Sequence, residues 1–305
     1  MPNHYLFQRA SCLAITIVLG ALASAAAQTF SFSTGDPDGR MATGSRPESA
    51  GKVEIESADD FNLTAPVTIN HASFTGLLPA NLPLSDVSEV VVEIYRVFPN
   101  DSTQPPSGHV PTRANSPSDV AFLSRDSAAS TLSFSTTLLS QQFTALNSVL
   151  NGIHPKPNQA TLGEGAVTGQ EVRFDINFTT PINLPIDHYF FIPQVQLTSG
   201  DFLWLSAPKP IVAPGTPFNP DLQSWIRNGD LDPDWLRVGT DIIDGTTPPT
   251  FNASFSLSGT VPDSVSTAGL LGMAMCLALG FRAIRERQAS LNLDRRIIAW
   301  RKRHD

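Results

Sequence analysis

Three carboxylates at alternate positions form the clearest metal-binding pattern in this sequence. Asp230, Asp232 and Asp234 are spaced by two, and Asp241 falls at position 12 if Asp230 is counted as position 1. A loop with this spacing can wrap oxygen ligands around a hard cation, here calcium. Trp235 stands at position 6, where the sharp turn of an EF-type loop uses glycine. Two interpretations therefore stay open, a calcium loop and a solvated acidic turn.

Two further acidic pairs are Asp36 with Asp38 and Asp59 with Asp60. Asp-Gly and Asx turns explain both pairs without a metal ion. A cation site that pools the two pairs from separate loops is the alternative.

Three tryptophans within residues 28–260 suggest a glycan surface. They are Trp204, Trp225 and Trp235. Tryptophans on the rim of a β-sandwich stack on sugar rings through their apolar faces. A core position is the alternative, because Phe202 and Trp204 alternate with their neighbours as buried strand residues do.

No local signature of a hydrolase is present. The sequence contains no G-x-S-x-G, no H-E-x-x-H and no cysteine beside a histidine. Four histidines are isolated and are expected on the surface or in loops: His71, His109, His154 and His188. A carboxylate pair for glycoside hydrolysis would have to be assembled from Glu54, Glu56, Glu164 and Glu171 or from the many aspartates. We therefore predict a non-catalytic protein with no cofactor other than calcium, and keep as the alternative an exported hydrolase that acts on polysaccharide through loop carboxylates.

The net charge of the region between the two chain ends limits the kinds of partner that it can bind. Residues 28–281 contain 11 Lys and Arg against 25 Asp and Glu, a formal charge of −14. Such a region is repelled by nucleic acid and by anionic membrane surfaces. Cations, neutral glycans such as extracellular polysaccharide, and other proteins remain as partners. The two cysteines, Cys12 and Cys276, lie near the chain ends, so the region between them has no disulfide.

Strand patterns dominate the region that must position these groups. Segments 171–178 and 251–258 alternate apolar and polar residues, which predicts half-buried antiparallel strands with Phe174, Ile176, Phe255 and Leu257 in the core. Further strands are predicted at 29–33, 52–56, 67–75, 89–98, 132–136, 188–197 and 201–205. Local helices are predicted at 138–150 and 220–227. Many strands without helical crossovers predict an all-β domain, an antiparallel β-sandwich over residues 28–260.

Two short stretches add detail to this fold. Residues 57–61 read S-A-D-D-F, and residues 90–95 read V-V-V-E-I-Y. Together they resemble the start of exported bacterial jelly-roll modules. The resemblance implies a jelly-roll-like sandwich and puts Asp59 and Asp60 in a turn.

The N-terminal residues 1–27 have the pattern of a secretory signal peptide. Arg9 precedes an apolar stretch at 13–22, and three alanines at 25–27 precede Gln28. This composition predicts export and removal of the segment.

The C-terminal end has three parts. A short polar motif comes first, made of Val261, Pro262, Asp263, Ser264, Ser266 and Thr267 around Val265. An apolar run at 268–281 follows; as a helix its 14 residues would span roughly 21 Å, less than the roughly 30 Å of a bilayer core. Three arginines then stop the run, and the positive-inside rule keeps them in the cytoplasm: Arg282, Arg285 and Arg287. An ordinary core helix at 268–281 is the alternative.

This tripartite end resembles the PEP-CTERM sorting signal of exported bacterial proteins, in the variant whose motif reads V-P-D-S-G-S-T; the signal is also labelled the C-terminal domain of ice-binding proteins. The resemblance implies that an exosortase-type enzyme processes the chain. It also implies a precursor anchored in the inner membrane by a transmembrane helix at 268–281, followed by release to the cell surface or extracellular matrix. The sorting signal would end at residue 287. Residues 288–305 form a basic cytoplasmic tail, interpreted as an amphipathic helix on the inner leaflet or as a disordered segment.

Overall fold

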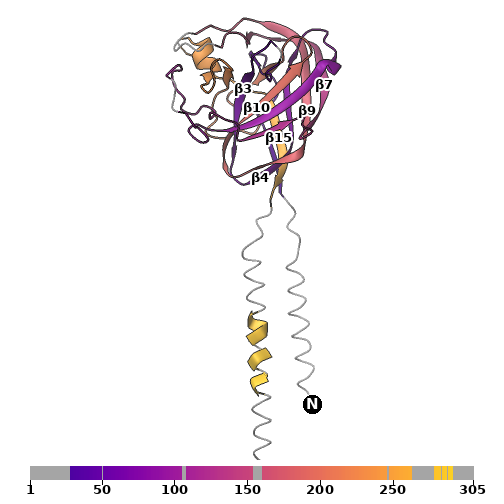
Figure 1. Ribbon diagram of the computed structural model, residues 1–305, viewed down its shortest axis with the longest axis vertical. Helices are drawn as coiled ribbons and strands as arrows, with labels where there is room; N and C mark the ends of the chain where they lie inside the picture. Colours follow the sequence, from indigo (N-terminus) through magenta and orange to yellow (C-terminus); the bar gives the residue numbers. More distant parts are fainter. Residues whose placement is uncertain are drawn as a thin grey trace, which may run out of the picture. The chain divides into compact units, whose positions relative to one another are not determined.

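A computed structural model describes residues 28–49, 51–104, 108–153, 160–245, 247–262, 278–282, 284–286 and 288–290. Thr29–Pro262 forms one compact unit. Its long elements are all strands, as Figure 1 shows, and this confirms the predicted all-β class.

The larger sheet contains nine of the described strands. Its main order is β1 (Gln28–Ser33), β15 (Phe255–Val261), β4 (Val67–Leu78), β11 (Leu203–Ala207), β2 (Met41–Gly44) and β8 (Asn147–Val149). β14 (Asn252–Ala253) pairs with β11, while β9 (Val167–Leu184) pairs with both β4 and β7 (Ser133–Ala145). β4 is antiparallel to β9, β11 and β15, whereas β2 and β8 are parallel. Among the described strands, β7 has β9 as its only partner.

The smaller sheet contains six described strands, all antiparallel to their neighbours. The order is β13 (Leu236–Arg237), β12 (Trp225–Asn228), β3 (Ile55–Leu63), β10 (Asp187–Leu197), β5 (Val87–Arg96) and β6 (Leu123–Asp126). A 3-10 turn, η1 (Leu84–Asp86), leads into β5, and a π-helical turn, η2 (Val238–Ile243), follows β13. β10 therefore separates β3 from β5, which matters for the site below.

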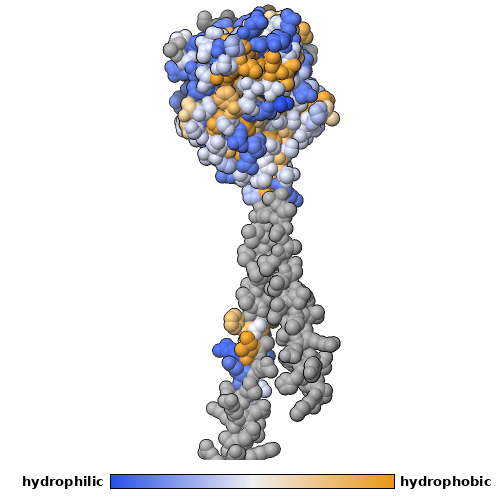
Figure 2. Space-filling view, turned by 90° about the vertical axis from the view of Figure 1, so that its right-hand side faces the viewer, coloured by the Kyte–Doolittle hydropathy of each residue, from blue (hydrophilic) through white to orange (hydrophobic). Residues whose placement is uncertain are grey.

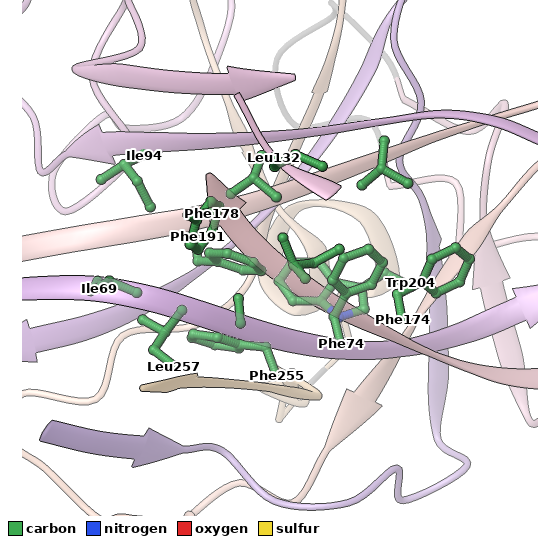
Figure 3. Close-up of a cluster of buried hydrophobic side chains, with 14 of the residues drawn as sticks. Ile69, Phe74, Ile94, Leu132, Phe174, Phe178, Phe191, Trp204, Phe255 and Leu257 are labelled. Atoms are coloured by element: carbon green, nitrogen blue, oxygen red, sulfur yellow. The ribbon is translucent and has the colours of Figure 1, made fainter. Parts of the chain in front are cut away.

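Both sheets contribute to one apolar core, which Figure 3 shows in close-up. Phe74 of β4 stacks on Phe174 of β9 at 4.8 Å between ring centres, and Phe191 of β10 stacks on Phe255 of β15 at 5.0 Å. The predicted core residues Phe174, Ile176, Phe255 and Leu257 are all buried. The alternation of 171–178 is thus confirmed. That of 251–258 holds only in part, because the polar residues Asn252 and Ser254 are buried too.

A second apolar cluster lies on the other face of the smaller sheet. It joins Ala58, Tyr95, Phe190, Ile192, Trp225 and Trp235. Residues alternate between the two faces of a strand, so the neighbours of this cluster at spacing two share its face. Glu56 on β3 and Glu93 on β5 are such neighbours.

Both predicted helices are wrong. Segment 138–150 forms the end of β7 and the strand β8, and segment 220–227 is irregular until β12 begins at Trp225. Strand pairing explains the second case, because Trp225 and Arg227 pair with Ala58 and Glu56 of β3. The turn predicted at 57–61 is also wrong, since these residues lie within β3.

The predicted ends lie mostly outside the described residues. This applies to 1–27, to Asp263, Ser264, Ser266 and Thr267, to Arg287, and to most of 268–281 and 288–305. Residues 278–282, 284–286 and 288–290 are helical, and Arg282 pairs with Glu286 one turn later. No helix in the described parts of the chain combines the length and the apolar character that crossing a membrane requires.

Candidate functional site

Three glutamates on or next to two strands converge on one face of the smaller sheet. Glu56 lies on β3, Glu54 directly precedes that strand, and Glu93 lies on β5. One carboxylate oxygen from each lies within 4.8 Å of the others. Among the described residues, this is the one group of three or more His, Cys, Asp or Glu side chains that meets this distance. We call it the glutamate cluster.

Neighbouring side chains hold the glutamate cluster in place. Tyr95 donates its hydroxyl hydrogen bond to Oε1 of Glu56 at 2.7 Å, and Nη2 of Arg227 donates to the Tyr95 oxygen at 2.9 Å. Nε of Arg227 also donates to Oε2 of Glu56. Gln194 of β10, the strand between β3 and β5, donates to Oε1 of Glu54 at 2.7 Å. Glu56 is only 3% exposed, so its charge depends on these partners.

Negative charge exceeds positive charge in this cluster. Arg227 is the cation bound to Glu56, and it also pairs with Asp232 at 2.6 Å. Burial, and then the charge of Glu56, raise the pKa of Glu93 to about 8. The same two causes raise the pKa of Glu54. Near neutral pH, Glu93 therefore keeps a proton unless a cation takes its place.

The proposed calcium loop is not assembled. Its members are Asp230, Asp232, Asp234 and Asp241. Asp232 pairs with Arg227, whereas the buried Asp234 lies 3.3 Å from Arg113. Asp241 pairs with Arg237 at 2.5 Å, and Asp230 is exposed. Three different arginines thus take up the charges that a calcium ion would need to share.

The predicted glycan-binding surface of tryptophans is also wrong. Trp204, Trp225 and Trp235 are 1%, 2% and 0% exposed, so none offers a ring face to a sugar. The indole nitrogens of Trp204 and Trp235 donate to the backbone oxygens of Ser254 and Ser118. These residues are part of the packing, which was the alternative from the sequence.

Asp59 and Asp60 are buried in β3 and belong to a second polar network. Asp60 lies 2.5 Å from Nε2 of His188, so this histidine is not isolated. Asp59 accepts hydrogen bonds from the Ala253 nitrogen at 2.8 Å and from Ser224 at 3.2 Å. Burial, and then the charge of Asp60, raise the pKa of Asp59 well above its usual range.

The other proposed carboxylates lie apart from the glutamate cluster. Asp38 accepts a hydrogen bond from Ser206, and Glu164 accepts from the backbone nitrogens of a loop at 150–152. Burial and the charge of Asp36 raise the pKa of Glu171 on β9. No described group combines Asp36 or Asp38 with Asp59 or Asp60 at ligand distance.

Comparison of this chain with protein-family models, with curated proteins and with solved structures finds no match.

Proposed function

We propose that this protein is an exported, non-catalytic component of the cell surface or extracellular matrix, and that its β-domain, which we infer to be jelly-roll-like, binds a divalent cation at the glutamate cluster. The observation that carries the proposal is the convergence of Glu54, Glu56 and Glu93, of which Glu56 pairs with Arg227. Calcium and similar hard cations prefer carboxylate oxygens. A bound cation would replace the proton of Glu93 and relieve the repulsion among the three groups.

The export route rests on the sequence of the two ends. In this proposal the signal peptide is removed before Gln28, the apolar run anchors the precursor in the inner membrane, and an exosortase-type enzyme acts near the motif 261–267. The last strand, β15, ends at Val261, so the motif begins where the folded domain ends. An enzyme could reach it there without unfolding the domain.

Mass spectrometry of the protein recovered outside the cell tests this route. We expect a chain that begins at Gln28 and ends before the apolar run at 268. A secreted chain that still ends at Asp305 would contradict processing.

Calcium should raise the melting temperature of the domain. A ligand at about 100 times its dissociation constant adds roughly 2.7 kcal/mol of stability, a shift of several degrees at this size.

Calcium affinity should rise as the pH increases from about 6 to about 9, because the raised pKa of Glu93 means that a proton must leave. Without calcium, stability should fall as the pH rises from about 4.5 toward about 8, since over this range the folded state holds a proton that the unfolded state has lost.

Two variants test whether calcium binds at the glutamate cluster or at the aspartates of 230–241. Glu93→Gln, a neutral replacement, should abolish the calcium shift and flatten the pH dependence. Asp230→Asn makes the same carboxyl-to-amide replacement at the exposed aspartate of the other region and should leave the calcium shift intact. A calcium shift that Glu93→Gln leaves unchanged, or no shift with calcium, magnesium or manganese, would exclude the glutamate cluster as a cation site.

The hydrolase alternative uses the same residues. Glu56, which pairs with Arg227, lies beside Glu93, whose pKa is raised to about 8, and glycoside hydrolysis needs two carboxyl groups in such unequal surroundings. Adding a panel of polysaccharides to the same thermal melt, and measuring whether they are consumed, distinguishes a hydrolase from a non-catalytic surface component. Consumption of a polysaccharide that Glu93→Gln abolishes would favour the hydrolase, whereas a melting shift without consumption would favour a polysaccharide-binding surface component.

A further inference from the structure

A lysine, an asparagine and an aspartate meet beside the end of β11, away from the residues of the glutamate cluster. Lys209 follows this strand by two residues, and Asn252 of β14 is paired with Ala207 of β11. Nζ of Lys209 donates to the side-chain oxygen of Asn252 at 2.9 Å. An amine nitrogen is thus in contact with a carboxamide group.

Asp221 contacts both of these side chains. Its Oδ1 lies 2.6 Å from Nζ of Lys209, and its Oδ2 accepts a hydrogen bond from Nδ2 of Asn252 at 3.3 Å. One carboxylate therefore touches a nucleophile with one oxygen and a leaving nitrogen with the other. A group in this position can carry a proton from the first nitrogen to the second.

From this contact we propose that the protein forms an intramolecular isopeptide bond between Lys209 and Asn252, with Asp221 transferring the proton. The neutral amine of Lys209 attacks Cγ of Asn252, and as it does so Asp221 takes one proton from Nζ. A bond from Nζ to Cγ forms and the bond from Cγ to Nδ2 breaks. Nδ2 receives the proton from Asp221 and leaves as ammonia. An amine and a carboxamide become a secondary amide and ammonia, so no oxidant, reductant or cofactor is needed.

Burial favours this step over hydrolysis of the amide. Asn252 is 1% exposed, and the side chains of Lys209 and Asp221 are 12% and 16% exposed. Little water can compete for Cγ in such a place. The neutral amine is the nucleophile in this step.

Backbone groups fix the attacking nitrogen. Nζ of Lys209 also donates to the carbonyl oxygens of Leu222 at 2.6 Å and of Asp221 at 3.1 Å. Holding two reactants in contact makes a slow reaction between them effectively unimolecular. The product would join the two ends of the segment between β11 and β14, in a domain that has no cysteine for a disulfide.

Intact mass and peptide mapping of the purified domain test the bond. We expect the folded protein to be lighter than its sequence by one ammonia, and a digest to contain one linked peptide pair that carries Lys209 and Asn252. Full mass with both peptides unlinked would overturn the proposal. Loss of ammonia without a linked pair would also overturn it, because cyclisation of Asn252 onto its own backbone gives the same mass.

Three single variants complete the test. Lys209→Arg and Asp221→Asn should each restore the full mass, and circular dichroism should show whether each is folded. Lys52→Arg is the matched control, because Nζ of Lys52 contacts a carboxylate, that of Asp201, and a carbonyl, that of Gly200, and it should keep the link. A link that persists in folded Asp221→Asn would overturn the role of this aspartate. If either variant fails to fold, the linked pair in the unmodified protein still decides whether the bond exists.

Discussion

Replacing Phe174 with alanine is expected to lower the free energy of unfolding by about 3–5 kcal/mol. The side chain is fully buried between the sheets, stacked on Phe74 and in edge contact with Phe202 at 5.4 Å. Its loss removes apolar burial and leaves a cavity that two strongly paired strands, β4 and β9, cannot close. Chemical denaturation followed by circular dichroism measures the change.

Asn177→Ala on the same strand is the matched control. This residue faces outward, and its replacement should change the stability by less than about 0.5 kcal/mol. A Phe174→Ala protein that loses less than about 1 kcal/mol would show that the stacked rings are not the centre of the core.

Replacing Arg227 with methionine is expected to cost about 3–5 kcal/mol, because removing one partner of a buried ion pair leaves the other charge uncompensated. Arg227 and Glu56 are both nearly fully buried, and Arg227 also supports the Tyr95 hydroxyl and lies 4.4 Å over the Trp235 ring. Denaturant unfolding at neutral pH measures the loss.

A double-mutant cycle separates charge from packing in this prediction. Adding Glu56→Gln to Arg227→Met should recover part of the lost stability, because the unpaired charge is removed. Losses that simply add in the double variant would contradict a direct interaction between the two side chains. Arg173→Met, at an exposed pair with Asp175, should cost less than about 1 kcal/mol.

The core could be predicted from sequence where a strand kept a regular alternation. Residues 171–177 of β9 pair without interruption along β4, so the period of two survived there. Segment 138–150 was misread as a helix because β7 has register shifts between Leu138 and Ser140 and between Ser140 and Phe143. Each such irregularity moves the apolar residues out of phase, and their spacing then resembles that of a helix.

The candidate site was beyond prediction for a different reason. Glu54 and Glu56 are spaced by two, as are Glu93 and Tyr95, and this spacing does indicate residues that share a strand face. Nothing local indicates that β10, nearly 100 residues later, lies between the two strands. Asp59 and Asp60 were assigned to a turn for the same reason, since the groups that accommodate them in a strand, such as His188 and the Ala253 nitrogen, come from distant segments.

Strand β7 bears on how copies of this protein approach one another in solution. Its 13 residues carry no charge, and its edge away from β9 has no partner among the described strands. Apolar patches also lie on the side of the domain that Figure 2 shows, where Figure 1 places β7 and β9. An open edge of this kind can pair with another chain, and here the domain's overall negative charge is the force that keeps copies apart. Dissolved salt screens that repulsion over about 8 Å at physiological strength. The ionic strength of the surrounding solution therefore sets how closely two copies approach through β7.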